Sequence, residues 1–292
     1  MRVVLTAVLA SVLVSSGAAS PQGRAAAVTD EPFEGLATWV DIYDSQVYTR
    51  PEATAARIAA RGVVTVFAET ANYKSTVDVV EPAALGRFVD ALHRSGIAVV
   101  GWYLPGFDRP GRDLRRTRAM LSFTTPAGDG FDGVALDVEA TIEKRVGVRT
   151  IRLVNLARRL RAESQIPLAA ITLPPRMLER RPTVWPGFPW ASLAGLVDAF
   201  VPMTYTGSAF RGYEATYGYV ARSLASLQAA TRAAGVETPV HAAGGVADRM
   251  SADELRAFVA AAADAGVEGI SLYDFHTTLP RGWKALAGFV PS

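Results

Sequence analysis

The chain has 292 residues, of which 50% are hydrophobic, and it contains no cysteine. The absence of cysteine excludes disulfide bonds, thiolate metal sites and a cysteine nucleophile. The formal net charge is only +2, and basic and acidic residues are interleaved, which argues against a nucleic-acid partner. A chain of this length can bury the core of one large α/β barrel as readily as the cores of two small domains.

The N-terminal segment is typical of a secretory signal peptide. Arg2 precedes an apolar run over residues 3–14, and small residues follow up to Ser20. A short transmembrane anchor is the alternative, although a membrane span needs about 20 apolar residues. We expect residues 1–27 to be a signal peptide with a short N-terminal segment, and the protein to be secreted, with membrane attachment only if this segment stays uncleaved.

Eight short runs rich in β-branched and aromatic residues follow, separated by amphipathic stretches. The predicted strands are residues 36–43, 63–68, 98–103, 133–138, 168–173, 199–205, 240–244 and 269–275. Their nearly continuous apolar character is typical of parallel strands covered on both faces. We therefore predict the α/β class and a single (β/α)8 TIM barrel of eight parallel strands over residues 28–292.

Helices are predicted between these strands, for example over residues 82–93 and 251–260, where apolar residues return every three or four positions. Ser251 and Glu254 have the spacing of a capping box. Glycines close four of the helical stretches: Gly62, Gly96, Gly235 and Gly266.

One connection, residues 174–193, is longer than the others. Its prolines include Pro182, Pro186 and Pro189, and Trp185 and Trp190 lie among them. This composition is incompatible with a plain helix. It predicts a structured loop over one end of the barrel, with both tryptophans available to stack on a sugar.

Active sites of such barrels lie at the carboxyl ends of the strands. The polar and aromatic candidates there are Asp41, Glu69, Trp102, Asp137, Glu139, Met203, Tyr205, Tyr273 and Asp274. The fourth predicted strand is the most informative, because side chains alternate and Ala135, Asp137 and Glu139 therefore share one face. Alternatively, Asp137 is a buried, hydrogen-bonded core residue and Glu139 a solvated loop residue.

Two carboxyl groups on one strand face stand roughly 6 to 7 Å apart along the strand. They repel each other when both are ionised, so one of them keeps its proton to a higher pH. A carboxyl group with such a raised pKa can act as a general acid near neutrality.

The segment Asp132-Gly-Val-Ala-Leu-Asp-Val-Glu139 resembles the Asp-Gly-x-Asp-x-Asp-x-Glu motif of family-18 glycoside hydrolases, with Ala135 in place of the middle Asp. Met203-Thr-Tyr205 resembles the Met-x-Tyr-Asp motif of that family, with Thr206 in place of the Asp. The resemblance implies a chitinase-like enzyme in which Glu139 is the general acid, Asp137 orients the substrate's acetamido group, and Tyr205 donates a hydrogen bond to it.

Family-25 muramidases offer a competing resemblance through Asp137, Glu139 and Asp41, but they do not explain Met203 and Tyr205. Either family implies cleavage of a β-glycosidic bond beside an N-acetylamino sugar, as in chitin or peptidoglycan. The remaining strand-end residues would bind substrate or support the catalytic groups. A non-catalytic carbohydrate-binding barrel is the second hypothesis, and Ala135 and Thr206 favour it.

No cofactor is expected, and the expected partner is a polysaccharide or oligosaccharide bound by a monomer. A metal site built from His241, His276 and Asp274 is the alternative, although no closely spaced histidine pair supports it. Trp39 is predicted to pack in the core, whereas core packing and sugar stacking remain equal alternatives for Trp102.

Overall fold

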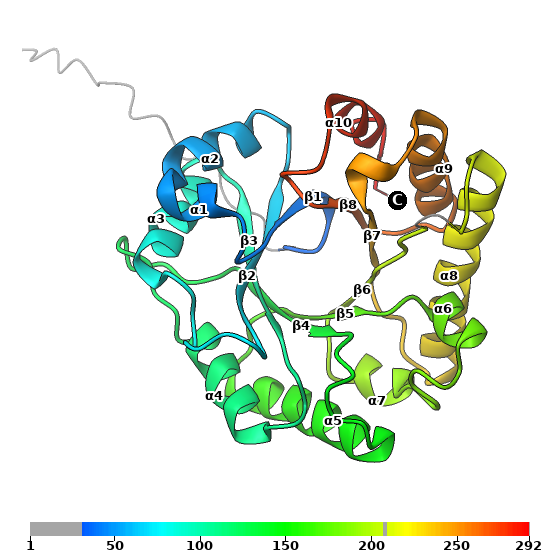
Figure 1. The fold of residues 1–292 in the computed structure, drawn as a ribbon, viewed down its shortest axis with the longest axis horizontal. Helices are drawn as coiled ribbons and strands as arrows, with labels where there is room; N and C mark the ends of the chain where they lie inside the picture. Colours follow the sequence, from blue (N-terminus) through cyan, green and yellow to red (C-terminus); the bar gives the residue numbers. More distant parts are fainter. Residues whose placement is uncertain (1–30, 207–208, 292) are drawn as a thin grey trace, which may run out of the picture.

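The computed structural model describes residues 31–206 and 209–291. The predicted signal peptide and the boundary at residue 27 lie outside these residues. The described chain forms one ring of parallel strands surrounded by helices (Figure 1), which confirms the predicted (β/α)8 barrel. No helix in this part of the chain is both long enough and apolar enough to cross a membrane.

The eight strands follow one another around the ring. They are β1 (Gly35–Val40), β2 (Thr65–Asn72), β3 (Ala98–Leu104), β4 (Gly133–Val138), β5 (Leu168–Thr172), β6 (Ala199–Pro202), β7 (His241–Gly245) and β8 (Gly269–Tyr273). Ladders join every neighbouring pair from β6 back through β1 to β8 and β7. Two isolated parallel bridges, Phe200 with Val240 and Met203 with Ala243, close the barrel between β6 and β7.

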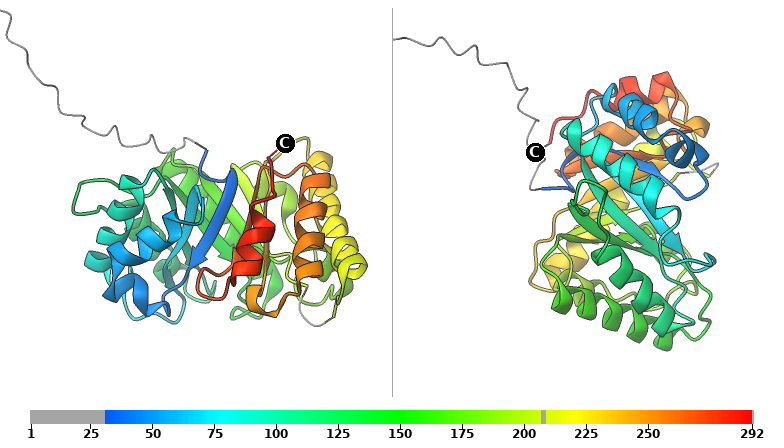
Figure 2. Two further views of the ribbon diagram at one scale, coloured as in Figure 1. Left: turned by 90° about the horizontal axis from the view of Figure 1, so that it is seen from above. Right: turned by 90° about the vertical axis from the view of Figure 1, so that its left-hand side faces the viewer.

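Helices form the outer layer (Figures 1 and 2). They are α1 (Ser45–Thr49), α2 (Pro51–Ala59), α3 (Pro82–Arg94), α4 (Pro110–Leu121), α5 (Val146–Glu163), α6 (Pro175–Arg180), α7 (Trp190–Ala194), α8 (Tyr213–Ala233), the 3-10 turn η1 (Ala247–Arg249), α9 (Ala252–Asp264) and α10 (Pro280–Leu286). The described chain begins and ends at one end of the barrel, opposite the carboxyl ends of the strands (Figure 2).

Local sequence signals account for several helix ends. Ser251 and Glu254 form the predicted capping box at the start of α9. The four glycines expected to end helices have positive φ angles between 63° at Gly266 and 74° at Gly235. This backbone conformation carries little steric cost only for glycine. The sequence therefore fixes where the chain leaves the outer layer.

The inside of the barrel is filled by aromatic rings and small residues. Trp39 stacks on Phe67 with 4.3 Å between ring centroids. Below them, His241 bonds through Nδ1 to the Phe33 carbonyl (2.8 Å) and through Nε2 to the Ser271 hydroxyl (2.9 Å). Burial lowers the pKa of His241 to about 4, so it is a neutral core residue. Among the described residues, buried side chains therefore fill the interior of the barrel below its mouth.

Several details differ from the sequence-based expectations. The first, sixth and eighth strands end at Val40, Pro202 and Tyr273 instead of at residues 43, 205 and 275. Strand β2 runs on to Asn72 instead of ending at residue 68, with a bulge between Glu69 and Ala71. The long connection is not only a loop, because it contains the short helices α6 and α7. Pro174, Pro175 and Pro189 stand at the starts of these two helices, where the missing N–H costs nothing, whereas Pro182 and Pro186 lie in the turns between them.

Candidate active site

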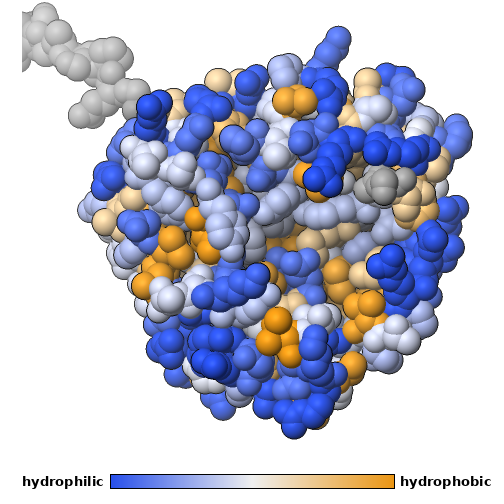
Figure 3. Space-filling view, in the orientation of Figure 1, coloured by the Kyte–Doolittle hydropathy of each residue, from blue (hydrophilic) through white to orange (hydrophobic). Residues whose placement is uncertain are grey.

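A cavity of about 340 Å³ opens at the carboxyl ends of the strands. Its lining residues come from β1 to β6, from β8 and from the connections that follow them: Trp39, Tyr43, Glu69, Asn72, Tyr73, Lys74, Trp102, Leu104, Asp137, Glu139, Ile171, Met203, Tyr205 and Tyr273. On this face, hydrophilic residues surround a central hollow in which apolar residues are visible (Figure 3). An apolar floor below a polar rim suits a sugar, which has both kinds of surface.

Strand β4 presents its carboxyl groups as the alternation of side chains predicts. Asp137 points into the barrel and is buried, whereas Glu139 follows the strand end and reaches solvent at the mouth. Val134 and Val138 point the other way and pack in the core beneath the helices. The Oδ1 atom of Asp137 is buried and has no hydrogen-bond partner among the described residues. An unsatisfied buried acceptor facing a cavity is available to a ligand donor.

The acidic groups of the cavity hold their protons to a higher pH than usual. Burial, followed by the nearby charges of Glu139 and Glu69, raises the pKa of Asp137 well above its ordinary value. Desolvation also raises the pKa of Glu139. Mutual repulsion means that these carboxyl groups do not all ionise together near neutral pH. The site can therefore supply a proton.

Glu69 is the third carboxyl group of the cavity. Its Oε2 atom accepts a hydrogen bond from the Ile42 backbone N–H (3.1 Å), and Oε1 accepts one from the Asn72 side chain (3.1 Å). Burial raises the pKa of Glu69 to about 7, although both hydrogen bonds act to lower it. The side chain is 4% exposed, so its position is set by these bonds and by packing.

Two tyrosines lie across the cavity from β4, with 6.1 Å between the ring centroids of Tyr205 and Tyr273. The Tyr273 hydroxyl donates to Asp41 Oδ2 at 2.8 Å. Burial and the charges of Asp137 and Glu139 raise the pKa of Tyr205 well above its ordinary value. Tyr205 therefore keeps its proton and can act as a hydrogen-bond donor inside the cavity.

The floor of the cavity is aromatic. Trp39 and Trp102 meet edge to face with 6.0 Å between ring centroids, and Met203 lies beside them. The indole N–H of Trp39 donates to the Ser271 hydroxyl (2.8 Å), so the prediction that Trp39 packs in the core is confirmed. The indole N–H of Trp102 has no partner among the described residues. Trp102 both packs in the core and faces the cavity.

Asp41 and Asp274 lie in an adjoining hollow, not on the wall of this cavity. They share it with Tyr43, Asp44 and His276. Asp274 accepts a hydrogen bond from the Thr277 N–H (2.8 Å) and so shapes the turn after β8. Asp41 accepts hydrogen bonds from two residues of the cavity lining, the Tyr273 hydroxyl and the Tyr43 N–H, which makes it a supporting residue.

The expectation that Trp185 and Trp190 lean towards substrate is corrected by their packing. Trp185 is 2% exposed, its ring lies 4.0 Å from the Arg149 guanidinium carbon, and its N–H donates to Thr150 Oγ1. Trp190 packs on Phe200 from the outer side of the sheet. Both tryptophans belong to the core between the helices and the barrel, so neither lines the cavity.

Sequence reasoning also overlooked part of the cavity wall. Asn72, Tyr73 and Lys74 line it because β2 continues past its bulge. An unbroken alternation from Glu69 would instead have turned Asn72 away from the barrel interior. The polar segment directly after Glu69 was the feature of the sequence that could have indicated this part of the wall. His241 and His276 do not meet, and the described residues contain no group of three or more potential metal ligands.

Asp132, the first residue of the acidic motif, has a structural position at the opposite end of β4. Its Oδ2 atom accepts hydrogen bonds from the Val99 N–H (2.7 Å) and pairs with His93 Nε2 (2.9 Å). It holds the start of β4 against β3 and α3. Only the last two acids of the motif belong to the cavity.

No protein-family model matches the sequence, and no curated protein matches it either. Solved structures do resemble it. The endo-β-1,4-mannanase from Thermotoga petrophila has a TM-score of 0.64 at 10% identity, over 83% of this chain and 68% of that one. The spore cortex-lytic enzyme SleL of Bacillus cereus has a TM-score of 0.62 at 10% identity, over 93% and 76%.

A family GH18 chitinase from Cycas revoluta also has a TM-score of 0.62, at 12% identity over 86% of this chain and 98% of that one. At such low identities the likeness establishes the shared barrel fold. The function has to be argued from the cavity itself.

Proposed function

We propose that the protein is a glycoside hydrolase that cleaves β-glycosidic bonds beside N-acetylamino sugars, in a polymer of the chitin or peptidoglycan type. One observation carries the proposal: Asp137, Glu139 and Tyr205 meet in a single cavity above the Trp39 and Trp102 floor. The similar barrels include a chitinase and a spore cortex-lytic enzyme, which supports this substrate class. The mannanase among them has a similar fold, so the fold by itself does not select the substrate.

In this proposal the reaction is retaining and assisted by the substrate. Protonated Glu139 gives its proton to the glycosidic oxygen as the bond to the anomeric carbon breaks. The acetamido oxygen of the substrate attacks that carbon from the other side, so no nucleophile from the protein is required. Tyr205 donates a hydrogen bond to this oxygen, and Asp137 accepts one from the acetamido N–H. Water activated by the Glu139 carboxylate then opens the cyclic intermediate and returns the proton.

The test is hydrolysis of soluble chitin and peptidoglycan fragments by the wild-type protein and by Glu139→Gln, with products identified by mass spectrometry. The amide keeps the shape of the side chain but has no proton to transfer, so product release should fall by about 100-fold or more. Glu214→Gln, on the exposed face of α8, is the matched control and should retain full activity. Equal release by wild type and Glu139→Gln would remove Glu139 from the reaction.

A non-catalytic carbohydrate-binding protein is the second candidate, and specific observations favour it. Ala135 and Thr206 stand where the resembling motifs have Asp, and the Asp137 Oδ1 atom has no partner within residues 31–206 and 209–291. Without the neighbouring carboxyl group, Asp137 has lost one means of being held in position. Binding of the same fragments with no product release by the wild-type protein would establish this candidate in place of the enzyme.

We also propose that the protein is secreted, on the strength of the apolar run over residues 3–14. This segment lies outside the described residues. Sequencing of the N-terminus of protein recovered from culture medium tests the proposal. A chain that stays with the cells and begins at Met1 would contradict it.

A further inference from the structure

The cavity rim carries a cationic side chain that has no role in the proposed reaction. Lys74 follows β2 and lines the same cavity as Asp137 and Glu139. It is one of only three lysines in the sequence, the others being Lys144 and Lys284. A cation at the mouth of an acidic cavity determines which charged ligands can enter. A role for Lys74 in the choice of substrate rests on the proposed function and concerns the substrate class of that site.

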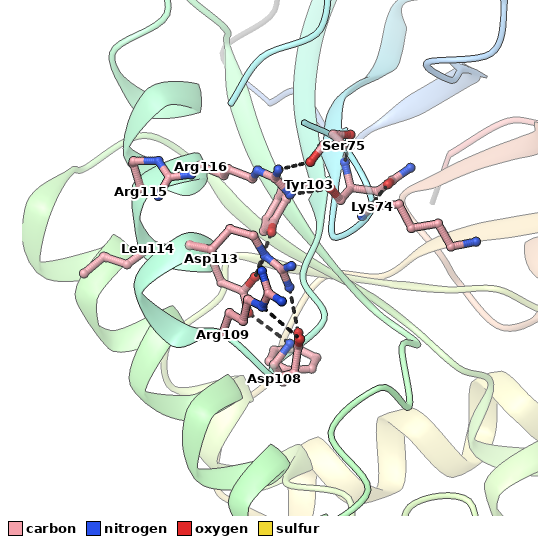
Figure 4. Close-up of polar contacts among 12 residues, drawn as sticks. Lys74, Ser75, Tyr103, Asp108, Arg109, Asp113, Leu114, Arg115 and Arg116 are labelled. Atoms are coloured by element: carbon pink, nitrogen blue, oxygen red, sulfur yellow. Dashed lines mark hydrogen bonds and ion pairs between the residues drawn. The ribbon is translucent and has the colours of Figure 1, made fainter. Parts of the chain in front are cut away.

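The loop that carries Lys74 is held in place by buried bonds from α4 (Figure 4). Arg116 is 2% exposed, and its guanidinium donates to the backbone carbonyls of Asn72 (2.5 Å) and Ser75. The Asn72 side chain accepts a hydrogen bond from the Lys74 N–H (2.9 Å). The backbone on both sides of Lys74 is therefore fixed, although the side chain is exposed.

A second contact ties the far end of this loop to the same helix. The Arg115 Nε atom donates to both carboxylate oxygens of Asp78, at 3.0 and 2.9 Å. Helix α4 thus bonds to the loop before and after Lys74. Fixing the backbone lowers the entropic cost of holding the ammonium against a ligand.

The charge of Lys74 is available to a ligand. Its Nζ atom lies 5.6 Å from the centre of the Tyr73 ring and makes no ion pair with a described carboxylate. Burial raises the pKa of Glu139, and no ion pair with Lys74 offsets that rise. In Figure 4 the side chain extends away from the bonded network of Arg116 and Ser75. The ammonium therefore serves neither the cavity acids nor the loop.

We infer that Lys74 is a specificity residue that pairs with a carboxylate on the substrate, so that the favoured substrate is an acidic glycan of the peptidoglycan type, not neutral chitin. The carboxyl groups of Glu69, Asp137 and Glu139 would otherwise repel such a substrate. A single lysine suits a carboxylate better than a phosphate dianion, which is usually held by several cations or by an arginine fork.

The experiment compares oligosaccharides of equal length in four forms. They are a glycan fragment of peptidoglycan with its lactyl carboxylate, the same fragment with that carboxyl reduced to an alcohol, an alternating uronic acid and N-acetylamino sugar fragment, and a neutral chito-oligosaccharide. The kcat/KM for each is measured with wild type, Lys74→Met, Lys74→Arg and Lys284→Met. Lys284 is exposed on α10 and does not line the cavity, so it provides the matched control.

The ratio of kcat/KM for the lactyl fragment to that for its reduced form should fall about ten-fold in Lys74→Met, and should stay within about two-fold of wild type in Lys74→Arg and Lys284→Met. The preference should also weaken at high ionic strength, because the side chain is exposed. If only the uronic acid fragment is hydrolysed, the carboxylate that pairs with Lys74 belongs to a uronic acid and not to a lactyl group. A ratio near one in wild type, or an equal loss on all fragments in Lys74→Met, would overturn the inference.

Binding to the Glu139→Gln protein, measured by calorimetry on the same four fragments, separates this inference from the proposed function. A preference for the lactyl fragment that Lys74→Met abolishes would support the inference even if wild type releases no product. Hydrolysis without any such preference would leave the enzyme proposal intact and remove the role of Lys74. Absence of binding to every fragment would overturn both.

Discussion

At the scale of single residues, burial decides the ionisation of the cavity. Glu69 is enclosed by β2, the turn after β1 and the Asn72 side chain, and its pKa rises to about 7. A folded-state pKa above the unfolded value means that the folded protein binds this proton more tightly. The corresponding stability is fully present below pH 4.5, where both states are protonated, and is lost as the pH rises towards 7.

We expect the unfolding free energy to vary less with pH in Glu69→Gln than in the wild type over this range. Between pH 4.5 and pH 7 the wild type should lose about 3 kcal/mol of unfolding free energy through Glu69, and the variant should lose correspondingly less. Urea unfolding at a series of pH values measures the difference. The exposed Glu214→Gln variant should follow the wild type. Identical curves for Glu69→Gln and wild type would show that Glu69 ionises normally.

At the scale of elements, aromatic residues in the long connection after β5 are structural. Trp185 fills the space between α5 and that connection, where Arg149 lies over its ring and Phe107 meets it edge to face. Arg149 is itself buried, and it donates to the Val184 carbonyl, so the two elements are bonded as well as packed. The connection is thus anchored to the outer layer instead of covering the mouth.

Trp185→Ala should therefore reduce stability and leave sugar affinity unchanged. Removing a buried indole creates a cavity and exposes Arg149, at a cost of about 3–5 kcal/mol of unfolding free energy. Chemical denaturation gives the stability, and calorimetric titration with an oligosaccharide gives the affinity. Tyr43→Ala should have the opposite effect. Because Tyr43 is 72% exposed at the cavity rim, its removal should weaken sugar affinity and leave stability unchanged. Weaker sugar binding in Trp185→Ala, with unaltered stability, would contradict this assignment.

At the scale of the whole molecule, the number of ladder hydrogen bonds differs between neighbouring strand pairs of the barrel. Strands β2 and β3 pair along their full length, from Thr65 to Asn72 on the β2 side. Strand β6 has four residues, one of them Pro202, and meets β7 through two isolated bridges. Pro202 has no N–H to donate, which shortens this ladder further.

We expect backbone amides at the seam between β6 and β7 to exchange with solvent faster than those between β2 and β3. Fewer ladder bonds lower the free energy of local opening. Hydrogen exchange followed by mass spectrometry on peptides covering each pair measures this difference. Equal protection of the two pairs would show that the barrel opens only as a unit.

The sequence by itself determined the eight βα units, the helix ends at glycine, and the face shared by Asp137 and Glu139. These features follow from local rules: hydrophobic period, capping chemistry and the alternation of side chains along a strand. The same alternation turns Ala135 into the barrel and Val138 towards the helices, as the structure has them. Such features can be predicted because they depend on neighbours close in the chain.

The tertiary structure alone decided which residues reach the cavity. A bulge in β2 brought Asn72 and Lys74 to the mouth, and packing against Arg149 took Trp185 away from it. Asp41 likewise lies in the adjoining hollow and bonds to Tyr273 of the cavity wall instead of lining the cavity. Each outcome depends on a partner distant in the sequence. The composition and periodicity of the sequence near a residue do not predict such a partner.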